Sequence, residues 1–184
     1  MIAEVLFTGT ELILGQTLNT NSQILQQTLA LLGIDLYYQV TAGDNLQRCA
    51  EAIKQAAARA DLIVVGGGLG PTEDDVSREA LAQALQVELQ SSAQGMEVVK
   101  RFFVQRGLCV SEKNKKQALV PAGGEILDNP VGTAPGIWLE QEGKTYILLP
   151  GPPHEFKKML QDVVVPRLKT KLGVHHLSLI HISG

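Results

Sequence analysis

The 184-residue sequence predicts an α/β domain built on a mostly parallel sheet. Two short apolar runs rich in β-branched residues, 2–7 and 61–65, each lead into a glycine-bearing loop, as expected for strands that are buried on both faces. The chain between them is expected to form a helix, a strand and a second helix. Strands that alternate with helices of this length form right-handed βαβ units, so the sequence indicates a doubly wound α/β layer.

The first helix is expected to start near residues 19–21 and to end at Gly33, because glycine commonly terminates helices. The next strand is expected at residues 34–41, and the helix after it takes either Asp44 or Asn45 as its N-cap. Both helices show an inner face at helical spacing. The first face is formed by Ile24, Leu25, Thr28, Leu29 and Leu32, and the second by Leu46, Cys49, Ala50, Ile53, Ala57 and Ala60.

The second half of the sequence is less regular. Helices are expected at residues 75–85 and about 93–106, and a hairpin of strands 137–140 and 145–149 is expected to turn at Glu142 and Gly143. Trp138, Phe102 and Phe103 are expected in the core. A last amphipathic helix, broken or kinked at Pro166, has an inner face formed by Phe156, Met159, Leu160, Val163 and Val164.

These elements are expected to form one domain over residues 1–172. Residues 173–184 are assigned to a non-native or truncated tail, because the segment from His176 onward has neither helix nor strand patterning. That segment resembles a translated adapter sequence from a sequencing library, which predicts that a longer natural protein is cut short here.

The composition excludes several classes of partner. Sixteen basic residues against nineteen acidic ones give a net charge of −3, which disfavours nucleic acid. No stretch approaches about 18 apolar residues, and the N-terminus lacks a basic signal region, so neither a membrane span nor export is expected. Cys49 and Cys109 belong to no CxxC pair, which predicts neither a disulfide framework nor a zinc knuckle and fits a cytoplasmic protein.

Three glycine-bearing loops follow apolar strands, at residues 9–15, 66–72 and 150–153. In an open α/β sheet such loops line the ligand crevice, and glycines let backbone amides approach a phosphate. Loop 66–72 is the best candidate for anion binding, although it matches neither the Walker A nor the GxGxxG pattern. A tight turn without a ligand explains the same residues.

Acidic side chains at positions 73–75 follow that loop. Two carboxylates beside a phosphate suit a divalent cation that polarises phosphorus and activates water. Alternatively, Thr72 and Asp75 form a capping box whose acid only offsets the helix dipole. Glu11 and Asp44 also follow expected strands, and either join the acidic group or serve as loop and cap residues.

Other polar residues offer weaker signals. Asn114 with Gln117, and the glycine-rich run 129–136, need either turn chemistry or a ligand to explain them. His154 is interpreted as a solvated residue of a helix's first turn. The sequence contains no Ser-His-Asp order, nucleophile elbow or HExxH helix, so acyl transfer and zinc proteolysis are unsupported.

Taken together, these segments resemble the N-terminal domain of the CinA (competence/damage-inducible) family, which has a molybdopterin-binding-like fold. The resemblance implies a three-layer αβα domain with a mostly parallel sheet of the MoaB and MogA type. It also implies a homodimer, and a separate C-terminal domain with nicotinamide mononucleotide deamidase activity. The matching segments are residues 9–15, 20–21, 43–45, 67–75, Asn114 with 116–118, 129–136 and 149–153.

The resemblance also implies roles for individual residues. Asp44 and Asp75 match the family's catalytic acidic positions and, with Glu11, are expected to hold a divalent metal. Gly66 departs from the family, in which related domains often have threonine. The expected ligand-binding residues are Gly9, Thr10, Glu11, Gly67, Gly68, Gly70, Thr72, Asn114, Gln117, Asn129, Gly132, Thr133, Gly151 and Pro152.

The resemblance implies metal-dependent hydrolysis of the pyrophosphate of ADP-ribose to AMP and ribose 5-phosphate, which is the leading functional hypothesis. Its rival is a non-catalytic module that binds molybdopterin or a nucleotide, as part of a truncated CinA-type protein. A purely structural dimerisation domain is a third reading, which explains the apolar helix faces but not the polar loops.

Overall fold

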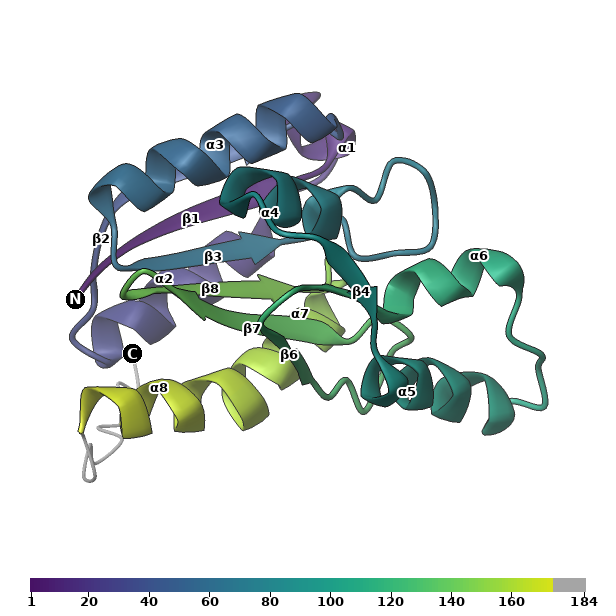
Figure 1. Ribbon diagram of the computed structural model, residues 1–184. Helices are drawn as coiled ribbons and strands as arrows, with labels where there is room; N and C mark the ends of the chain where they lie inside the picture. The colour runs from purple at the N-terminus through teal and green to yellow at the C-terminus, as the bar shows by residue number, and fades with distance from the viewer. Residues whose placement is uncertain (174–184) are drawn as a thin grey trace.

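A six-stranded mixed sheet lies between two layers of helices in the computed structural model, which describes residues 1–173 (Figure 1). The strand order is β2-β1-β3-β8-β7-β6. The strands β2, β1, β3 and β8 are parallel, and β7 and β6 are antiparallel additions at one edge. The strands are β1 (Ile2–Thr8), β2 (Asp35–Ala42), β3 (Leu62–Gly66), β6 (Gly124–Leu127), β7 (Gly136–Gln141) and β8 (Lys144–Leu149).

Helices cover both faces of this sheet (Figure 1). On one face lie α3 (Leu46–Arg59) and α4 (Ser77–Leu85), and on the other lie α2 (Thr20–Leu31), α7 (Pro153–Met159) and α8 (Val165–Leu172). The remaining elements are α1 (Thr10–Ile13), β4 (Leu89–Ser91), α5 (Ala93–Val104), α6 (Glu112–Lys115), η1 (Lys116–Ala118), β5 (Leu119–Pro121) and η2 (Leu160–Val164). The expected three-layer αβα architecture is therefore confirmed.

Alternation along the central strands produces two separate cores. Ile63 and Val65 of β3 join the cluster under α3 and α4, and Leu62 and Val64 join the cluster under α2, α7 and α8. All five residues of β3 are buried, as expected for a strand covered on both faces.

The structure shows which residues cap α2 and α3. The Asn19 side chain caps α2 by accepting a hydrogen bond from Ser22 N at 3.1 Å. Asn45, and not Asp44, caps α3, because Asn45 Oδ1 accepts a hydrogen bond from Arg48 N at 3.0 Å. Asp44 is thereby left for another role.

The hairpin and the last helix differ in how well the sequence predicted them. Gln141 pairs with Lys144 across a two-residue turn at Glu142 and Gly143, both of which have positive φ, so the expected hairpin is confirmed. The expected break at Pro166 does not occur, and the alternative of a kink there stays a prediction. The chain continues from α7 through the π-helix η2 into α8, where Pro166 lies in the first turn and needs no N–H donor.

Two expectations about the core and the start of α4 are wrong. Trp138 is buried, but Phe102 and Phe103 are only half-buried, because α5 lies beyond the edge of the sheet (Figure 1). Helix α4 begins at Ser77 and not at residue 75, because the Asp75 side chain closes a turn with Thr72 before the helix starts.

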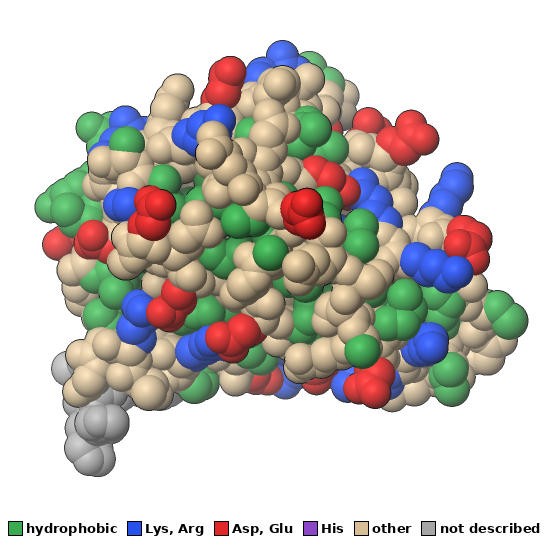
Figure 2. Space-filling view, viewed as in Figure 1, with side chains coloured by type: hydrophobic (Ala, Val, Ile, Leu, Met, Phe, Trp, Pro, Cys, Tyr) green, Lys and Arg blue, Asp and Glu red, His purple; other side chains and the backbone are tan. Residues whose placement is uncertain are grey.

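Three further observations concern the surface charges, the helix lengths and the C-terminus. Acidic and basic side chains are interspersed on the face seen in Figure 2. No helix within residues 1–173 is long and apolar enough to cross a membrane. The tail expected at residues 173–184 lies outside the described residues, except for Gly173, which is the left-handed C-cap of α8.

Candidate functional site

A pocket of about 620 Å³ opens at the carboxyl ends of β1, β3 and β8. These three strands are neighbours and parallel, so the loops that follow them meet at one edge of the sheet. All three glycine-bearing loops contribute to its wall. The expected site residues that line it are Gly9, Glu11, Asp44, Gly67, Gly68, Gly70, Thr72, Asp75, Gln117, Thr133, Gly151 and Pro152.

The loop after β3 has a backbone that only glycine accommodates. Gly67 and Gly68 have φ values of +99° and +67°. A Cβ atom at Gly68 would lie 2.3 Å from Ser77 Oγ, and one at Gly67 would lie 2.7 Å from the carbonyl oxygen of Thr8. Ser77, at the start of α4, anchors this loop by donating from Oγ to the carbonyl oxygen of Gly67 at 2.7 Å. The loop is therefore a rigid backbone surface facing the pocket.

Packing explains why Gly66 stands where the family resemblance leads one to expect threonine. A Cβ atom at this position would lie 2.7 Å from the Phe7 ring and 3.1 Å from the Phe156 ring. The two rings pack against each other with their centroids 6.1 Å apart. Glycine is therefore required here by the aromatic side chains beneath the loop.

The Asp75 carboxylate is fixed beside the glycine loop by Thr72. Asp75 Oδ2 accepts hydrogen bonds from Thr72 N at 2.9 Å and from Thr72 Oγ1 at 2.6 Å. A Cβ atom at Gly70 would lie 2.4 Å from the same carboxylate oxygen, so the acid occupies space that Gly70 leaves free. The capping-box contacts are thus present, but they close a turn and do not begin a helix.

Two cations lie behind this loop and outside the pocket lining. Lys116 Nζ donates to the carbonyl oxygens of Thr72 and Asp75 at 2.7 and 2.6 Å. The buried guanidinium of Arg78 donates to the carbonyl oxygen of Leu69, and its burial lowers the pKa of Arg78 to about 10. Neither residue was predicted to support the site, although Lys116 lies in one of the segments that resemble the family, because neither basic side chain follows a strand.

Asp44 is held from the opposite side by Thr10. Asp44 Oδ2 accepts hydrogen bonds from Thr10 N at 2.9 Å and Thr10 Oγ1 at 3.0 Å. Thr10 itself does not line the pocket, so its expected ligand contact is replaced by this contact with Asp44. The Glu11 carboxylate lies over Gly9, where a Cβ atom would be 2.7 Å from Glu11 Oε1.

Asn114 is the start of a hydrogen-bonded chain that reaches the pocket. Asn114 Oδ1 accepts from Ser111 N at 3.1 Å, and Asn114 Nδ2 donates to Gln117 Oε1 at 3.1 Å. Gln117 Nε2 then donates to Thr133 Oγ1 at 2.8 Å. Asn114 does not line the pocket, so the expected ligand contact falls to Gln117 and Thr133, which Asn114 positions.

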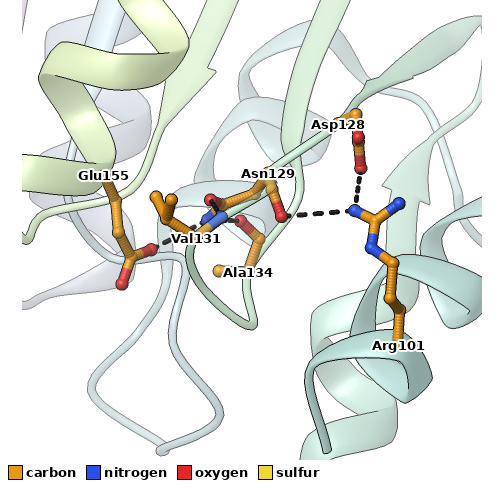
Figure 3. A network of polar contacts seen from close by, with 6 residues as sticks. All are labelled: Arg101, Asp128, Asn129, Val131, Ala134 and Glu155. Atoms are coloured by element: carbon orange, nitrogen blue, oxygen red, sulfur yellow. Dashed lines mark hydrogen bonds and ion pairs between the residues drawn. The ribbon is translucent and has the colours of Figure 1, made fainter. Parts of the chain in front are cut away.

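Asn129 and Gly132 likewise lie behind the pocket wall, and Figure 3 shows what Asn129 holds. Asn129 Nδ2 donates to the carbonyl oxygen of Ala134 and to Glu155 Oε2, each at 2.8 Å. Gly132 packs against the Glu155 carboxylate, since a Cβ atom there would lie 2.0 Å from Oε2. Glu155, which lines the pocket, was missed by the sequence analysis although it follows the 150–153 loop closely.

Two asparagines from the start of α2 complete the pocket. Asn21 Nδ2 donates to the carbonyl oxygen of Gly151 at 2.8 Å. Asn21 Oδ1 and Asn19 Nδ2 are buried without a hydrogen-bond partner, and both residues line the pocket. Unpaired buried polar atoms are costly, so these atoms are suited to a polar ligand.

The pocket has a strongly acidic lining. Among residues 1–173, no Lys, Arg or His side chain lines it, whereas five carboxylates do: Glu11, Asp44, Asp74, Asp75 and Glu155. Within residues 1–173, however, no three His, Cys, Asp or Glu side chains gather closely enough to form a metal site by themselves. A cation in this pocket would therefore need ligand oxygens in addition to protein carboxylates.

Known proteins are similar to this chain over nearly all of its length. The family model described as a probable molybdopterin binding domain matches residues 4–170. A putative competence-damage inducible protein of Moorella thermoacetica is 56% identical over 169 residues, which are 92% of this chain and 41% of that protein. A CinA-like protein of Gloeothece citriformis is 46% identical over 93% of this chain and 41% of its own length. The chain thus spans about two fifths of these curated relatives.

Solved structures are also similar to this chain. The crystal structure of a CinA protein of unknown function from Thermoplasma acidophilum is 30% identical, with a TM-score of 0.83 over 93% of this chain and 98% of that one. MoaB, a molybdopterin biosynthesis enzyme of Thermus thermophilus, is 17% identical with a TM-score of 0.62 over 94% of each chain, which shows a shared fold. This chain belongs to the molybdopterin binding domain family and, within it, to the CinA family.

Proposed function

We propose that this domain hydrolyses the pyrophosphate of ADP-ribose to AMP and ribose 5-phosphate with the help of a divalent cation. The observation that carries the proposal is the combination, in one pocket, of a rigid glycine backbone with carboxylates on both sides of it. Phosphoryl transfer depends mainly on positioning and on charge neutralisation, and this combination provides for both.

The charges of the pocket support the need for a cation. The part of the chain that the structure describes contributes five carboxylates and no basic side chain to the lining, which would repel a diphosphate. Carboxylate oxygens are the donors that Mg²⁺ and related hard cations prefer, and such cations commonly bind through one or two carboxylates plus substrate phosphates. Asp44, Asp75 and Glu11 are the candidates to hold the ion. Since no three such side chains gather within residues 1–173, one or two of them would bind it together with phosphate oxygens of the ligand. When bound, the ion would neutralise charge on the phosphates and lower the pKa of a water molecule.

The protein residues would divide the remaining work. The backbone N–H groups of Gly68, Leu69 and Gly70 would bind one phosphate. Gly67 N is not included, because it donates to the carbonyl oxygen of Leu149 at 2.9 Å. Thr72 and Thr10 hold Oδ2 of Asp75 and Oδ2 of Asp44, so Oδ1 of each acid is the oxygen that would serve the ion or the water. In the reaction, a water oxygen bonds to one phosphorus atom as the bridging P–O bond breaks. The bridging oxygen then leaves with the other phosphate.

The experiment that tests the proposal measures AMP by chromatography after incubation with ADP-ribose, with and without a divalent metal. Metal-dependent AMP formation is expected, and Asp75→Asn is expected to abolish it. Glu73→Gln is the matched control, because Glu73 is exposed, lies two residues away and does not line the pocket. Equal rates for Asp75→Asn and the parent would show that the assigned role is wrong.

A non-catalytic module that binds molybdopterin or a nucleotide is the second candidate. It is favoured by the hydrogen bonds that already engage Asp44 and Asp75, and by the absence, within residues 1–173, of a preassembled group of three metal-binding side chains. Calorimetric binding of a nucleotide in EDTA, without turnover when metal is added, would support this function over hydrolysis.

The biological setting is part of the same proposal. We place the domain in the cytoplasm as a homodimer, and we assign nicotinamide mononucleotide deamidase activity to a further C-terminal domain and not to this chain. The further domain is supported by the lengths of the relatives, of which this chain spans 41%. Sedimentation of the purified chain tests the dimer, and a deamidase assay of the same sample is expected to show no activity.

A further inference from the structure

One part of the pocket wall contains a carboxylate that the proposed chemistry does not use. Glu155 lies in the first turn of α7, and its side chain lines the pocket. Asn129, which is only 1% exposed, holds Glu155 Oε2 (Figure 3). The orientation of the Asn129 amide is set by Val131 N, which donates to Asn129 Oδ1 at 3.2 Å, so that Nδ2 is the group that faces Glu155.

Gly132 makes room for this carboxylate. A Cβ atom at Gly132 would lie 2.0 Å from Glu155 Oε2 and 2.6 Å from Oε1, and Gly132 does not have a positive φ. The Glu155 carboxylate therefore occupies space that the missing side chain of Gly132 leaves free, and a Cβ atom there would displace it. A buried asparagine and a glycine thus fix one acceptor group at the pocket wall.

A hydrogen-bond donor lies next to this acceptor in the chain. Thr133 follows Gly132, and Thr133 Oγ1 accepts a hydrogen bond from Gln117 Nε2. The direction of that bond is fixed by Ser111 N, an obligatory donor, through Asn114 and Gln117. Because its oxygen already accepts from Gln117, the Thr133 hydroxyl is left to donate its own proton toward the pocket.

Glu155 thus brings an acceptor, and Thr133 a donor, to the lining of the same pocket. Such a pair is suited to a hydroxyl group, which both donates and accepts. A phosphate at this position would be repelled by the Glu155 carboxylate. We infer that Glu155 and Thr133 bind a ribose hydroxyl of the ligand, with Glu155 as the residue that distinguishes ribose from deoxyribose. This inference rests on the proposed function for the identity of the ligand, and it deepens that function by assigning the sugar its own subsite.

Calorimetry tests the subsite without requiring turnover. The probes are ribose 5-phosphate against 2-deoxyribose 5-phosphate, and AMP against 2′-deoxy-AMP and 3′-deoxy-AMP, each with Mg²⁺. We expect the parent protein to bind the hydroxylated member of at least one set about tenfold more tightly, as for one hydrogen bond to a charged group. We expect Glu155→Ala to reduce that preference to within about twofold.

Gly132→Ala tests the same subsite while keeping the glutamate. Its Cβ atom would displace the Glu155 carboxylate, so the preference for the hydroxylated probe should fall as it does in Glu155→Ala. Glu51→Ala, at an exposed acid on α3, is the control that should keep the full preference. Thermal unfolding followed by circular dichroism checks that each variant is folded.

The possible results separate this inference from the proposed function. A preserved preference without any AMP formation from ADP-ribose would contradict hydrolysis and support the subsite. A second result would overturn the subsite: the parent hydrolyses ADP-ribose with metal, and Glu155→Ala loses affinity equally for the hydroxylated and the deoxy probe of each set. Glu155 would then act on the metal or water. A parent protein that shows no preference, or binds none of the probes, would also overturn it.

Discussion

Asp44, which lines the pocket, and Thr10 lie 34 residues apart in the sequence and are joined by three hydrogen bonds. Thr10 follows β1 and Asp44 follows β2, and these two strands are parallel neighbours. Asp44 is therefore oriented by the loop of another strand and not by the helix that it precedes.

The first prediction concerns this contact. Thr10→Val removes the hydroxyl donor but keeps the shape of the side chain, so Asp44 should lose part of its orientation. We expect the affinity for the nucleotide to fall about tenfold, as for loss of one hydrogen bond to a charged group. Thr10→Ser keeps the hydroxyl and should retain most of the affinity. Equal affinities of Thr10→Val and the parent in calorimetry would contradict this role.

The second prediction separates backbone strain from crowding at the glycine loop. Gly68 and Gly107 have nearly equal φ values, +67° and +65°, but a Cβ atom would meet Ser77 at Gly68 and no atom within 4 Å at Gly107. Gly107→Ala should therefore lower the free energy of unfolding by about 1–2 kcal/mol. Gly68→Ala should lower the free energy of unfolding by about a further 1–3 kcal/mol, because its Cβ atom also clashes with Ser77.

Urea denaturation of both variants measures that difference. Gly68→Ala should also lose binding of the phosphorylated ligand, whereas Gly107→Ala should retain it, because Gly107 does not line the pocket. Similar destabilisation of the two proteins would mean that the contact with Ser77 relaxes without cost.

The third prediction concerns Lys116, which holds the turn that carries Asp75. Lys116→Met removes the donor to the carbonyl oxygens of Thr72 and Asp75, so this turn should loosen. We expect about a tenfold loss of kcat/KM or of ligand affinity, from the loss of charged hydrogen bonds. Lys115→Met is the control, since Lys115 is exposed and pairs only with its neighbour Glu112. A comparable loss of kcat/KM or affinity in Lys115→Met would show that the loss of a positive charge, and not the contact with the turn, causes the effect.

The fourth prediction uses the two cysteines, which are both free. Burial raises the pKa of the Cys49 thiol above its ordinary value of 9.0, whereas Cys109 is exposed. The reactive species is the thiolate, so iodoacetamide at pH 8 should modify Cys109 and leave Cys49 unmodified in the folded protein. Mass spectrometry of tryptic peptides reads both sites, and urea should make Cys49 reactive. Rapid modification of Cys49 without denaturant would show that its site opens.

The raised pKa of Cys49 also sets the sign of a pH effect on stability. The folded state holds this proton more tightly than the unfolded state. The contribution of Cys49 to stability is therefore complete below the ordinary thiol pKa and is lost as the pH rises through the folded value. Cys49→Ala should reduce the fall in stability at alkaline pH, which urea denaturation from pH 7 to 10 measures.

Local patterns in the sequence were sufficient for most of the secondary structure. The apolar runs of β1 and β3 reflect burial on both faces of a parallel sheet, and the turn at Glu142 and Gly143 was set by local backbone preference. The expectation for Phe102 and Phe103 was wrong because hydrophobicity does not reveal that α5 lies beyond the sheet. The start of α4 was wrong because Asp75 bonds back to Thr72.

The sequence by itself determined the alternation of strands and helices, the three glycine-bearing loops and the acids that follow them, because these depend on backbone period and on turn chemistry. Only the tertiary structure decided which of those residues meet. Strand order brings Asp44 to Thr10, and the space left by Gly132 admits Glu155 to the pocket wall. Such contacts depend on packing between distant segments, which no local pattern encodes.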